Sequence, residues 1–252
     1  MLPFITDPLF YAVAVPAVLL TGLAKSGFAA GFGVLATPLM ALALPAPQAA
    51  AILLPLLLAM DLTGLQQMWH DRDRTMVKRL VLWGVLGVVL GTLLVGLLSP
   101  KAVAGWLGAM TLAFLAQRLL FKPAPGSAAP SRSWESVSAT LSGFTSFVAH
   151  AGSPPIMAYL LPLKLPARTL TATLAVYFAG VNAVKVVPYA ALGLLDTRNL
   201  ATSLLLLPIA PLGVWAGVWL VRRVDGTWFY RLMYAGMFLA GSKLLWDGLS
   251  PI

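Results

Sequence analysis

The chain consists of long apolar stretches interrupted by short polar or Gly/Pro-rich breaks. Four stretches carry no formal charge: those between Lys25 and Asp61, Arg79 and Lys101, Glu135 and Lys164, and Arg198 and Arg222. Each can supply the ~20 apolar residues that one transmembrane helix needs. The pattern therefore predicts an all-α fold, a polytopic helical bundle embedded in a lipid bilayer.

Breaks at proline, glycine and charged residues divide the chain into two sets of five apolar segments. The first set covers 8–27, 31–44, 48–70, 76–98 and 102–121, and the second covers 134–149, 153–162, 167–194, 200–221 and 228–246. Between them lies KPAPGSAAPSRS, whose composition is typical of a linker. We expect a first repeat over 1–121, a linker over 122–133 and a second repeat over 134–252.

Glycine and Leu-Pro landmarks recur in the same order in both sets. An offset of 121 places Gly22 on Gly143, Gly31 on Gly152 and Leu44-Pro45 on Leu165-Pro166, and an offset of 126 places Gly87 on Gly213 and Gly91 on Gly217. Single coincidences are common between apolar, Gly-rich sequences. Five landmarks in order indicate an internal duplication.

The distribution of basic residues predicts the orientation, because short cytoplasmic loops carry an excess of Lys and Arg. The loop over residues 70–79 holds four cations and is assigned to the cytoplasm. Counting one crossing per later segment places eleven loop cations and the linker inside, and two cations and the N-terminus outside. With five segments per half, the second half is inserted upside down, as in many secondary transporters.

Composition narrows the class of protein further. Hydrophobic residues make up 60% of the 252 residues and charged residues 10%, whereas soluble domains hold roughly 25% charged residues. The net charge of +9 comes from dispersed loop cations, which argues against nucleic-acid binding. With no cysteine and two histidines, we expect no metal and no cofactor. The first eight residues lack signal-peptide features, so we expect the first segment to remain part of the fold. The sequence leaves open whether the protein forms a homo-oligomer.

Each half opens with a Gly-rich break, LTGLAKSGFAAGFGVLATPL over 20–39 and LSGFTSFVAHAGSPPIMAYL over 141–160. The segment after each break is too short to span comfortably, so each half should open with a broken-helix hairpin. Backbone groups freed at such a break must be buried in protein or line a wet cavity. Helix starts after Gly33 and Ser153 would suit an anion. Close helix packing alone would also explain such glycines, but a matched pair favours a shared site.

Four ionisable residues lie inside apolar segments: Lys25, Asp61, His150 and Lys185. Such residues are costly in lipid and mark a functional interior. Asp61 aligns with Asn182 at the 121 offset, and Lys185 follows one helical turn later. We favour Asp61 as the partner of Lys25 or Lys185, and the second interpretation is a proton-coupling group.

The predicted substrate site draws cations, backbone N–H groups and neutral donors from both halves. It comprises Lys25, Ser26, Gly31, Gly33, His150, Gly152, Ser153, Asn182 and Lys185, with Asp61 as the coupling residue. A small anionic substrate fits this set.

Two rival functions come from other classes of protein. An intramembrane hydrolase would use Ser146 or Ser153 with His150, and such a pair needs an orienting acid. Asp61 is the one candidate acid, and neither GxSxG nor HExxH occurs, so we do not expect an enzyme. The other rival is a non-transporting subunit that binds a partner protein, but an anchor has no need of two broken helices.

The stretches GLAKSGFAAGFGVLATPLMALALP, over 22–45, and GFTSFVAHAGSPPIMAYLLPLKLP, over 143–166, each end in Leu-Pro. With the two homologous halves, they resemble the TauE/SafE sulfite exporter family over nearly the whole chain. The resemblance implies an inner-membrane secondary transporter that exports small sulfur-containing anions, such as sulfite or organosulfonates. Family motifs often hold adjacent glycines where this chain has Gly31-Phe32-Gly33 and Gly152-Ser153-Pro154.

Overall fold

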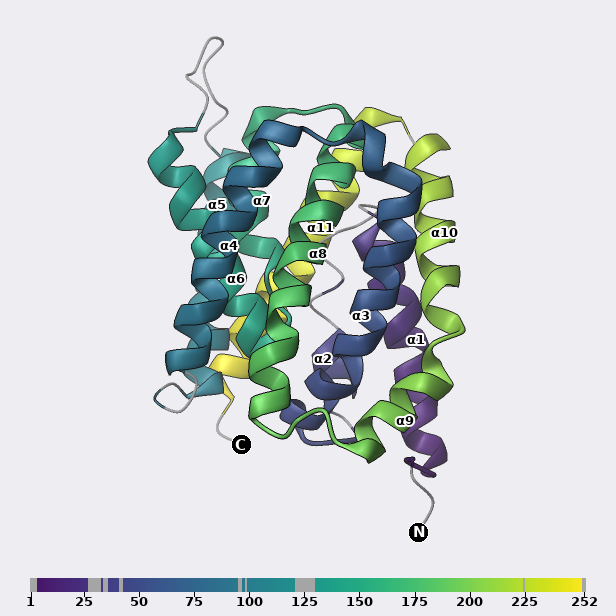
Figure 1. Cartoon of the computed structure of the whole chain (residues 1–252). Helices are drawn as coiled ribbons and strands as arrows, with labels where there is room; N and C mark the ends of the chain where they lie inside the picture. Colours follow the sequence, from purple (N-terminus) through teal and green to yellow (C-terminus); the bar gives the residue numbers. More distant parts are fainter. Residues whose placement is uncertain are drawn as a thin grey trace.

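The protein is a bundle of α-helices that stand side by side (Figure 1). The computed structural model describes residues 4–26, 33, 36–40, 43–94, 97, 99–120, 130–223 and 225–250. Within these ranges there are eleven α-helices and no β-strand. The all-α prediction is confirmed.

The first half of the chain forms α1 (Pro8–Lys25), α2 (Ala36–Met40), α3 (Ala46–Met68), α4 (Arg74–Leu94) and α5 (Pro100–Leu120). The second half forms α6 (Arg132–Ala149), α7 (Ser153–Leu160), α8 (Ala167–Ala191), α9 (Thr197–Leu206), α10 (Ile209–Arg223) and α11 (Gly226–Leu249). Short polar side chains cap several starts, as Asp7 does for α1 and Ser131 for α6, because they accept bonds from first-turn N–H groups. The start of α1 and the end of α11 lie at one end of the bundle, and the α3–α4 turn lies at the other (Figure 1).

Four described helices are long and apolar enough to cross a bilayer: the spans Pro8–Lys25, Gln48–Asp71, Arg74–Leu94 and Ala167–Ala191. The pair α9 and α10 forms a fifth candidate span, bent by 46°. By contrast, α7 has eight residues and is only ~12 Å long, and α2 has five. Both are too short to cross a hydrocarbon core of ~30 Å as helices. The chain is thus a multi-pass membrane protein.

The segment expected as one run over 200–221 is divided in the structure. Helix α9 ends at Leu206 and α10 begins at Ile209. Pro208 lies at the bend, and a proline ring lacks the N–H and clashes with the carbonyl one turn earlier. The single-segment expectation is corrected to a broken span.

Glycines mark the closest helix crossings. A Cβ on Gly22 of α1 would lie 2.7 Å from the Cα of Gly213 on α10. A Cβ on Gly143 of α6 would lie 1.9 Å from the carbonyl oxygen of Gly84 on α4, and one on Gly87 would lie 2.0 Å from that of Thr140. Small residues allow backbones to approach this closely in membrane bundles. Most glycine landmarks of the sequence are therefore packing positions.

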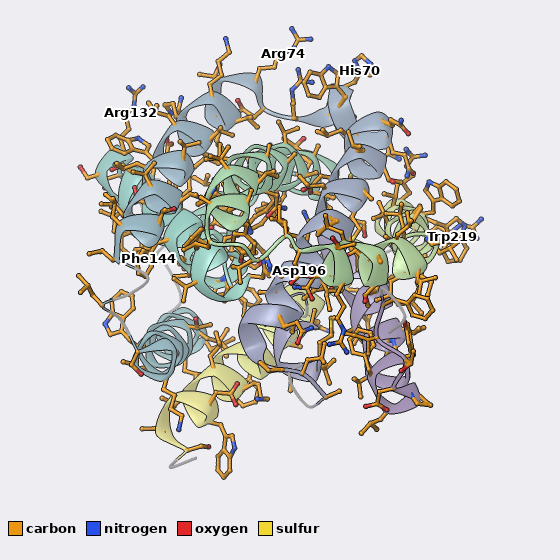
Figure 2. The ribbon with its side chains drawn as sticks, turned by 60° about the horizontal axis from the view of Figure 1, so that its bottom comes forward. His70, Arg74, Arg132, Phe144, Asp196 and Trp219 are labelled. Atoms are coloured by element: carbon orange, nitrogen blue, oxygen red, sulfur yellow. The ribbon has the colours of Figure 1, made fainter. Side chains whose placement is uncertain are left out.

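The helices α3 and α8 are the most buried of the candidate spans, and α1 and α4 expose more of their surface. Large apolar side chains lie on the outside, such as Leu93 on α4 and Trp219 on α10. Polar His70, Arg74 and Arg132 project from one end of the bundle, and Trp219 points outward from its flank (Figure 2). An apolar flank with polar ends is the surface that a bilayer covers.

Candidate functional site

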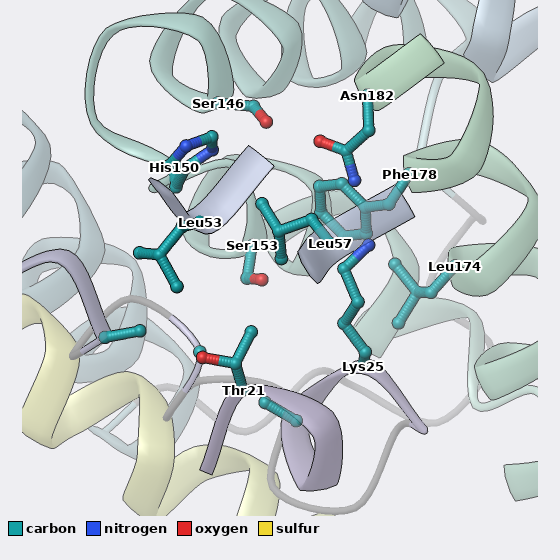
Figure 3. A pocket seen from close by; sticks show the side chains of 13 residues that line it. Thr21, Lys25, Leu53, Leu57, Ser146, His150, Ser153, Leu174, Phe178 and Asn182 are labelled. Atoms are coloured by element: carbon teal, nitrogen blue, oxygen red, sulfur yellow. The ribbon is translucent and has the colours of Figure 1, made fainter. Parts of the chain in front are cut away.

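A cavity lies where α1, α2, α3, α6, α7 and α8 meet. Polar and apolar side chains from both halves of the chain line it (Figure 3). The lining residues are Thr21, Ala24, Lys25, Gly33, Ala36, Leu53, Leu57, Ser146, His150, Ser153, Leu174, Phe178 and Asn182. Residues far apart in the sequence therefore face the same space, as do Thr21 and Ser146, which are 125 positions apart.

The first polar cluster at the cavity joins Lys25 of α1, Asp61 of α3 and Asn182 of α8. The Lys25 ammonium forms an ion pair with Oδ1 of Asp61, and their side chains are 12% and 5% exposed. The amide of Asn182 donates to Oδ2 of Asp61 over 2.7 Å. Both carboxylate oxygens thus have a donor, which a buried carboxylate requires. The ammonium of Lys25 points toward Asn182 and Phe178 (Figure 3) and lies 5.9 Å from the centre of the Phe178 ring.

The second polar cluster joins Lys185 of α8, Ser146 of α6 and His150. Lys185 is fully buried. Its ammonium donates to the carbonyl and hydroxyl oxygens of Ser146, at 3.1 and 3.0 Å, and contacts Nδ1 of His150 at 3.0 Å. The other ring nitrogen, Nε2, lies 3.0 Å from the carbonyl oxygen of Ala50 on α3. A carbonyl only accepts, so Nε2 carries the hydrogen and Nδ1 accepts from Lys185.

The two clusters differ in charge. Lys25 is balanced by Asp61. All three donors of Lys185 are used by neutral acceptors, and no carboxylate of the described chain forms an ion pair with it. A protonated Lys185 would therefore place behind the cavity wall a positive charge that no carboxylate of the described chain balances, and a bound anion would compensate it.

Hydrogen bonds across the second break hold its backbone. His150 ends α6 in a left-handed conformation, with φ of 52°. Ser142 donates to the carbonyl of Gly152 over 2.6 Å, and Thr145 donates to that of Ala151 over 3.0 Å. Carbonyls that the break frees therefore find donors on α6, as a buried break requires.

The structure brings most of the predicted site residues together. Lys25, Gly33, His150, Ser153 and Asn182 line the cavity, and Asp61 and Lys185 contact those residues from behind.

Two other predicted residues, Ser26 and Gly152, do not line the cavity. Ser26 is buried, donates to the carbonyl of Leu23 over 2.6 Å and packs where Gly217 of α10 approaches. Gly152 packs beside Phe178 and Ser146 and does not line the cavity. The predicted residue Gly31 lies outside the described residues.

Sequence reasoning missed the large apolar lining residues Leu53, Leu57, Leu174 and Phe178. Leu174, Phe178 and Asn182 follow one another at spacings of four on α8, and Leu53 and Leu57 precede Asp61 in the same way on α3. Residues four apart share a helix face. Projecting the predicted residues Asp61 and Asn182 back along their helix faces would have found the four apolar positions.

The geometry does not support the hydrolase alternative. No hydrogen bond joins His150 to the hydroxyl of Ser146 or Ser153 within the described part of the chain, because Lys185 and Ala50 occupy both ring nitrogens. A serine nucleophile needs a base that can take its proton. The histidine here is a bridge between α3 and α8.

Comparison with known proteins identifies the family. No curated protein and no solved structure gives a significant match to the chain. The family described as Sulfite exporter TauE/SafE matches residues 14–244, which include both breaks and both polar clusters. The chain therefore belongs to the sulfite exporter TauE/SafE family of membrane transporters.

Proposed function

We propose that this protein is a secondary transporter that exports small sulfur-containing anions, sulfite or organosulfonates, by alternating access around the central cavity. The observation that carries the proposal is the convergence of polar side chains from both halves on one space: Lys25 from the first, and Ser153 and Asn182 from the second. Secondary transporters bind their substrates at such an interface between halves.

The surplus charge of Lys185 supports an anionic substrate. A buried cation without a carboxylate partner is unfavourable in a low-dielectric interior. A bound anion would relieve this cost, so the empty and loaded states would differ in stability as transport requires. Ser153 and the start of α7 would add neutral hydrogen bonds.

The apolar wall supports an organic group on the substrate. Leu53, Leu57, Leu174 and Phe178 line the cavity together with the polar residues. A sulfonate head beside Lys25 would place a short carbon chain against these side chains, whose burial contributes favourably.

Reciprocal helix contacts support an inverted repeat of residues 1–121 and 134–252. Gly22 of α1 packs on Gly213 of α10, and its counterpart Gly143 of α6 packs on α4, which carries Gly87. Ser26 meets Gly217, and its counterpart at the 121 offset, Phe147, meets Gly91. The first helix of each half thus packs against a helix of the other half. Rocking of the pairs α1–α10 and α6–α4 against α3 and α8 would open the cavity to either side of the membrane.

Loop charge supports the orientation of this repeat in the inner membrane. The linker over 122–133 and the α3–α4 turn would face the cytoplasm, and the N-terminus would lie outside.

Asp61 is the proposed coupling group. An arriving anion would compete with its carboxylate for the Lys25 ammonium, and Asp61 would take up a proton when it loses that partner. Anion movement and proton movement would then be linked at one ion pair.

Flux measurements in proteoliposomes test the function. The reconstituted protein should accelerate sulfite or alkanesulfonate movement, and Lys25→Ala should abolish it. Because that change leaves Asp61 without its cation, Lys25→Ala/Asp61→Asn is measured beside it to keep the fold. Lys101→Ala, an exposed lysine at the start of α5, is the matched control and should transport normally.

Two outcomes would reject the proposal. One is a tightly sealed vesicle in which the folded protein moves no small anion, which would favour the non-transporting subunit. The other is full flux in the double variant.

A further measurement tests proton coupling. Asp61→Asn should make the remaining flux independent of an imposed pH gradient.

A further inference from the structure

A second, smaller pocket lies where α3 ends, α8 begins and α10 ends. Its lining residues are Met68, Asp71, Arg168, Thr171, Val218 and Arg222, and we name it the arginine pocket. It lies at the same end of the bundle as His70 and Arg74 in Figure 2, because Asp71 directly follows His70.

The arginine pocket has two cations with free hydrogen-bonding capacity. In the described chain, neither Arg168 nor Arg222 forms an ion pair with a carboxylate. A guanidinium presents five N–H donors in a planar fork that matches the oxygens of sulfonate, sulfite or phosphate. Asp71 is the opposing charge in the lining.

A buried hydroxyl without a partner provides independent support for a ligand. Thr171 is fully buried and lines the pocket, and its Oγ1 has no hydrogen-bond partner among the described residues. Buried polar groups are nearly always hydrogen-bonded, so an orphan needs an explanation. No side chain caps the start of α8 beside it, which leaves first-turn N–H groups toward the same region.

The arginine pocket and the central cavity share two helix faces. On α8, Thr171 lines the pocket and Leu174, one turn further, lines the cavity. On α3, Met68 lines the pocket two turns after Asp61, and Asp61 follows the cavity-lining Leu57 by one turn. Residues three, four and seven apart lie on one face, so both spaces lie along the seam between α3 and α8.

Side chains fill the seam between the two spaces. A Cβ on Gly64 would lie 3.4 Å from Cε of Met68 and 3.9 Å from Cβ of Ala175. Met68 is buried and belongs to the same packed cluster as Ala175 and Leu57. The flexible Met68 side chain is thus part of the packing between the pocket and the cavity.

We propose that the arginine pocket is an oxyanion site, where the transported anion is loaded before it reaches the central cavity. The anion lies between the guanidiniums of Arg168 and Arg222 and accepts a hydrogen bond from Thr171. The negative charge of Asp71 keeps the affinity for the anion low enough that the anion can leave the pocket for the central cavity. The loading role rests on the proposed function, whereas oxyanion binding does not. A lipid phosphate has the same chemistry, and the experiment separates the two sources.

Binding is measured first, with sulfite as the probe, by calorimetry in detergent. The Lys25→Ala/Asp61→Asn background is used, because it weakens the central cavity. We expect weak binding that falls about tenfold in Arg168→Gln/Arg222→Gln, since two charge-assisted contacts are lost. Asp71→Asn should tighten it. Arg74→Gln is the control and should bind as its parent does, because Arg74 is exposed and lies three residues after Asp71 but not in the pocket lining.

Flux in vesicles of phosphatidylcholine alone then tests loading. Arg168→Gln/Arg222→Gln should raise KM for sulfite about tenfold with a nearly unchanged maximal rate, because a loading site acts on capture. If the variant differs from the parent only when phosphatidylglycerol is added, the occupant is a lipid phosphate and the oxyanion site stands without the loading role. Binding and KM that are both unaffected by the double substitution overturn the proposal. Absent flux with intact binding rejects the transport function alone.

Discussion

The two buried lysines of the cavity differ in how the protein stabilises them. Lys25 lies beside a carboxylate, Asp61, and retains some exposure toward the cavity. Lys185 is fully buried and donates only to the neutral groups of Ser146 and His150. The carboxylate of Asp61 compensates a positive charge on Lys25 even without substrate. Neutral acceptors leave a positive charge on Lys185 uncompensated, so that charge would contribute a net positive potential. Under the proposed function, Lys25 exchanges partners and Lys185 keeps the site electropositive.

The largest expected effect separates these two roles. Lys25→Met should reduce the free energy of unfolding by about 3–5 kcal/mol, because it leaves a buried carboxylate without its cation. Lys185→Met should cost less than half of that, since it also removes a buried charge whose desolvation is unfavourable. Denaturation of the purified variants in detergent measures both.

The matched control for this comparison is Lys25→Met/Asp61→Asn, which removes the pair together. It should recover most of the lost stability. Equal losses in the two single lysine variants, or no recovery in the double variant, would show that the carboxylate does not distinguish the lysines.

A smaller effect compares the two glycine crossings. Gly143→Ala should destabilise the protein by about 3 kcal/mol, because its Cβ would lie 1.9 Å from a rigid carbonyl oxygen. Gly22→Ala should cost about 1–2 kcal/mol, since its nearest atom is at 2.7 Å. Thermal unfolding ranks them. Gly64→Ala is the control, with its nearest contact at 3.4 Å to the end of the Met68 side chain; a loss there as large as at Gly143 would refute the packing argument.

The smallest effect compares hydroxyls at matching positions of the two breaks, Thr21 and Ser142, which are 121 residues apart. Ser142 donates across the break to Gly152, whereas Thr21 donates to Ala17 within its own helix over 2.6 Å. Ser142→Ala should cost about 1–2 kcal/mol, because a buried carbonyl loses its donor. Thr21→Val should cost about 0.5 kcal/mol or less, since the Ala17 carbonyl keeps its place in the helix. The reverse order in chemical unfolding would mean that the first break also relies on its hydroxyl.

Much of the fold was predictable from the local sequence. The start of α1 at Pro8, of α7 at Ser153 and of α8 at Ala167 agree with the predicted segments, because proline, short polar caps and apolar runs act within a few residues. The α9–α10 bend was not predictable from its proline alone. Pro16, Pro55 and Pro188 lie inside continuous helices, and neighbouring helices decide whether a proline breaks a membrane helix.

The candidate site was predictable in its charged residues and not in its contacts. Lys25, Asp61, His150 and Lys185 stand out because ionisable groups in apolar segments are rare. Which of them pair was not visible: Asp61 had two candidate lysines, and the structure joins it to Lys25. The adjacent residues Lys25 and Ser26 point to different surroundings, the cavity and α10, because successive residues of a helix do not share a face.

The amino-acid sequence by itself determined the membrane class, the two sets of segments, the paired breaks and the set of intramembrane charges. These follow from local composition, since hydrocarbon excludes charge and unsatisfied backbone wherever they occur. Only the tertiary structure decided which helices cross at the glycines, which lysine takes the carboxylate, and that the seam between α3 and α8 holds two pockets. Those features depend on contacts between residues far apart in the chain, where packing and charge pairing are settled by geometry.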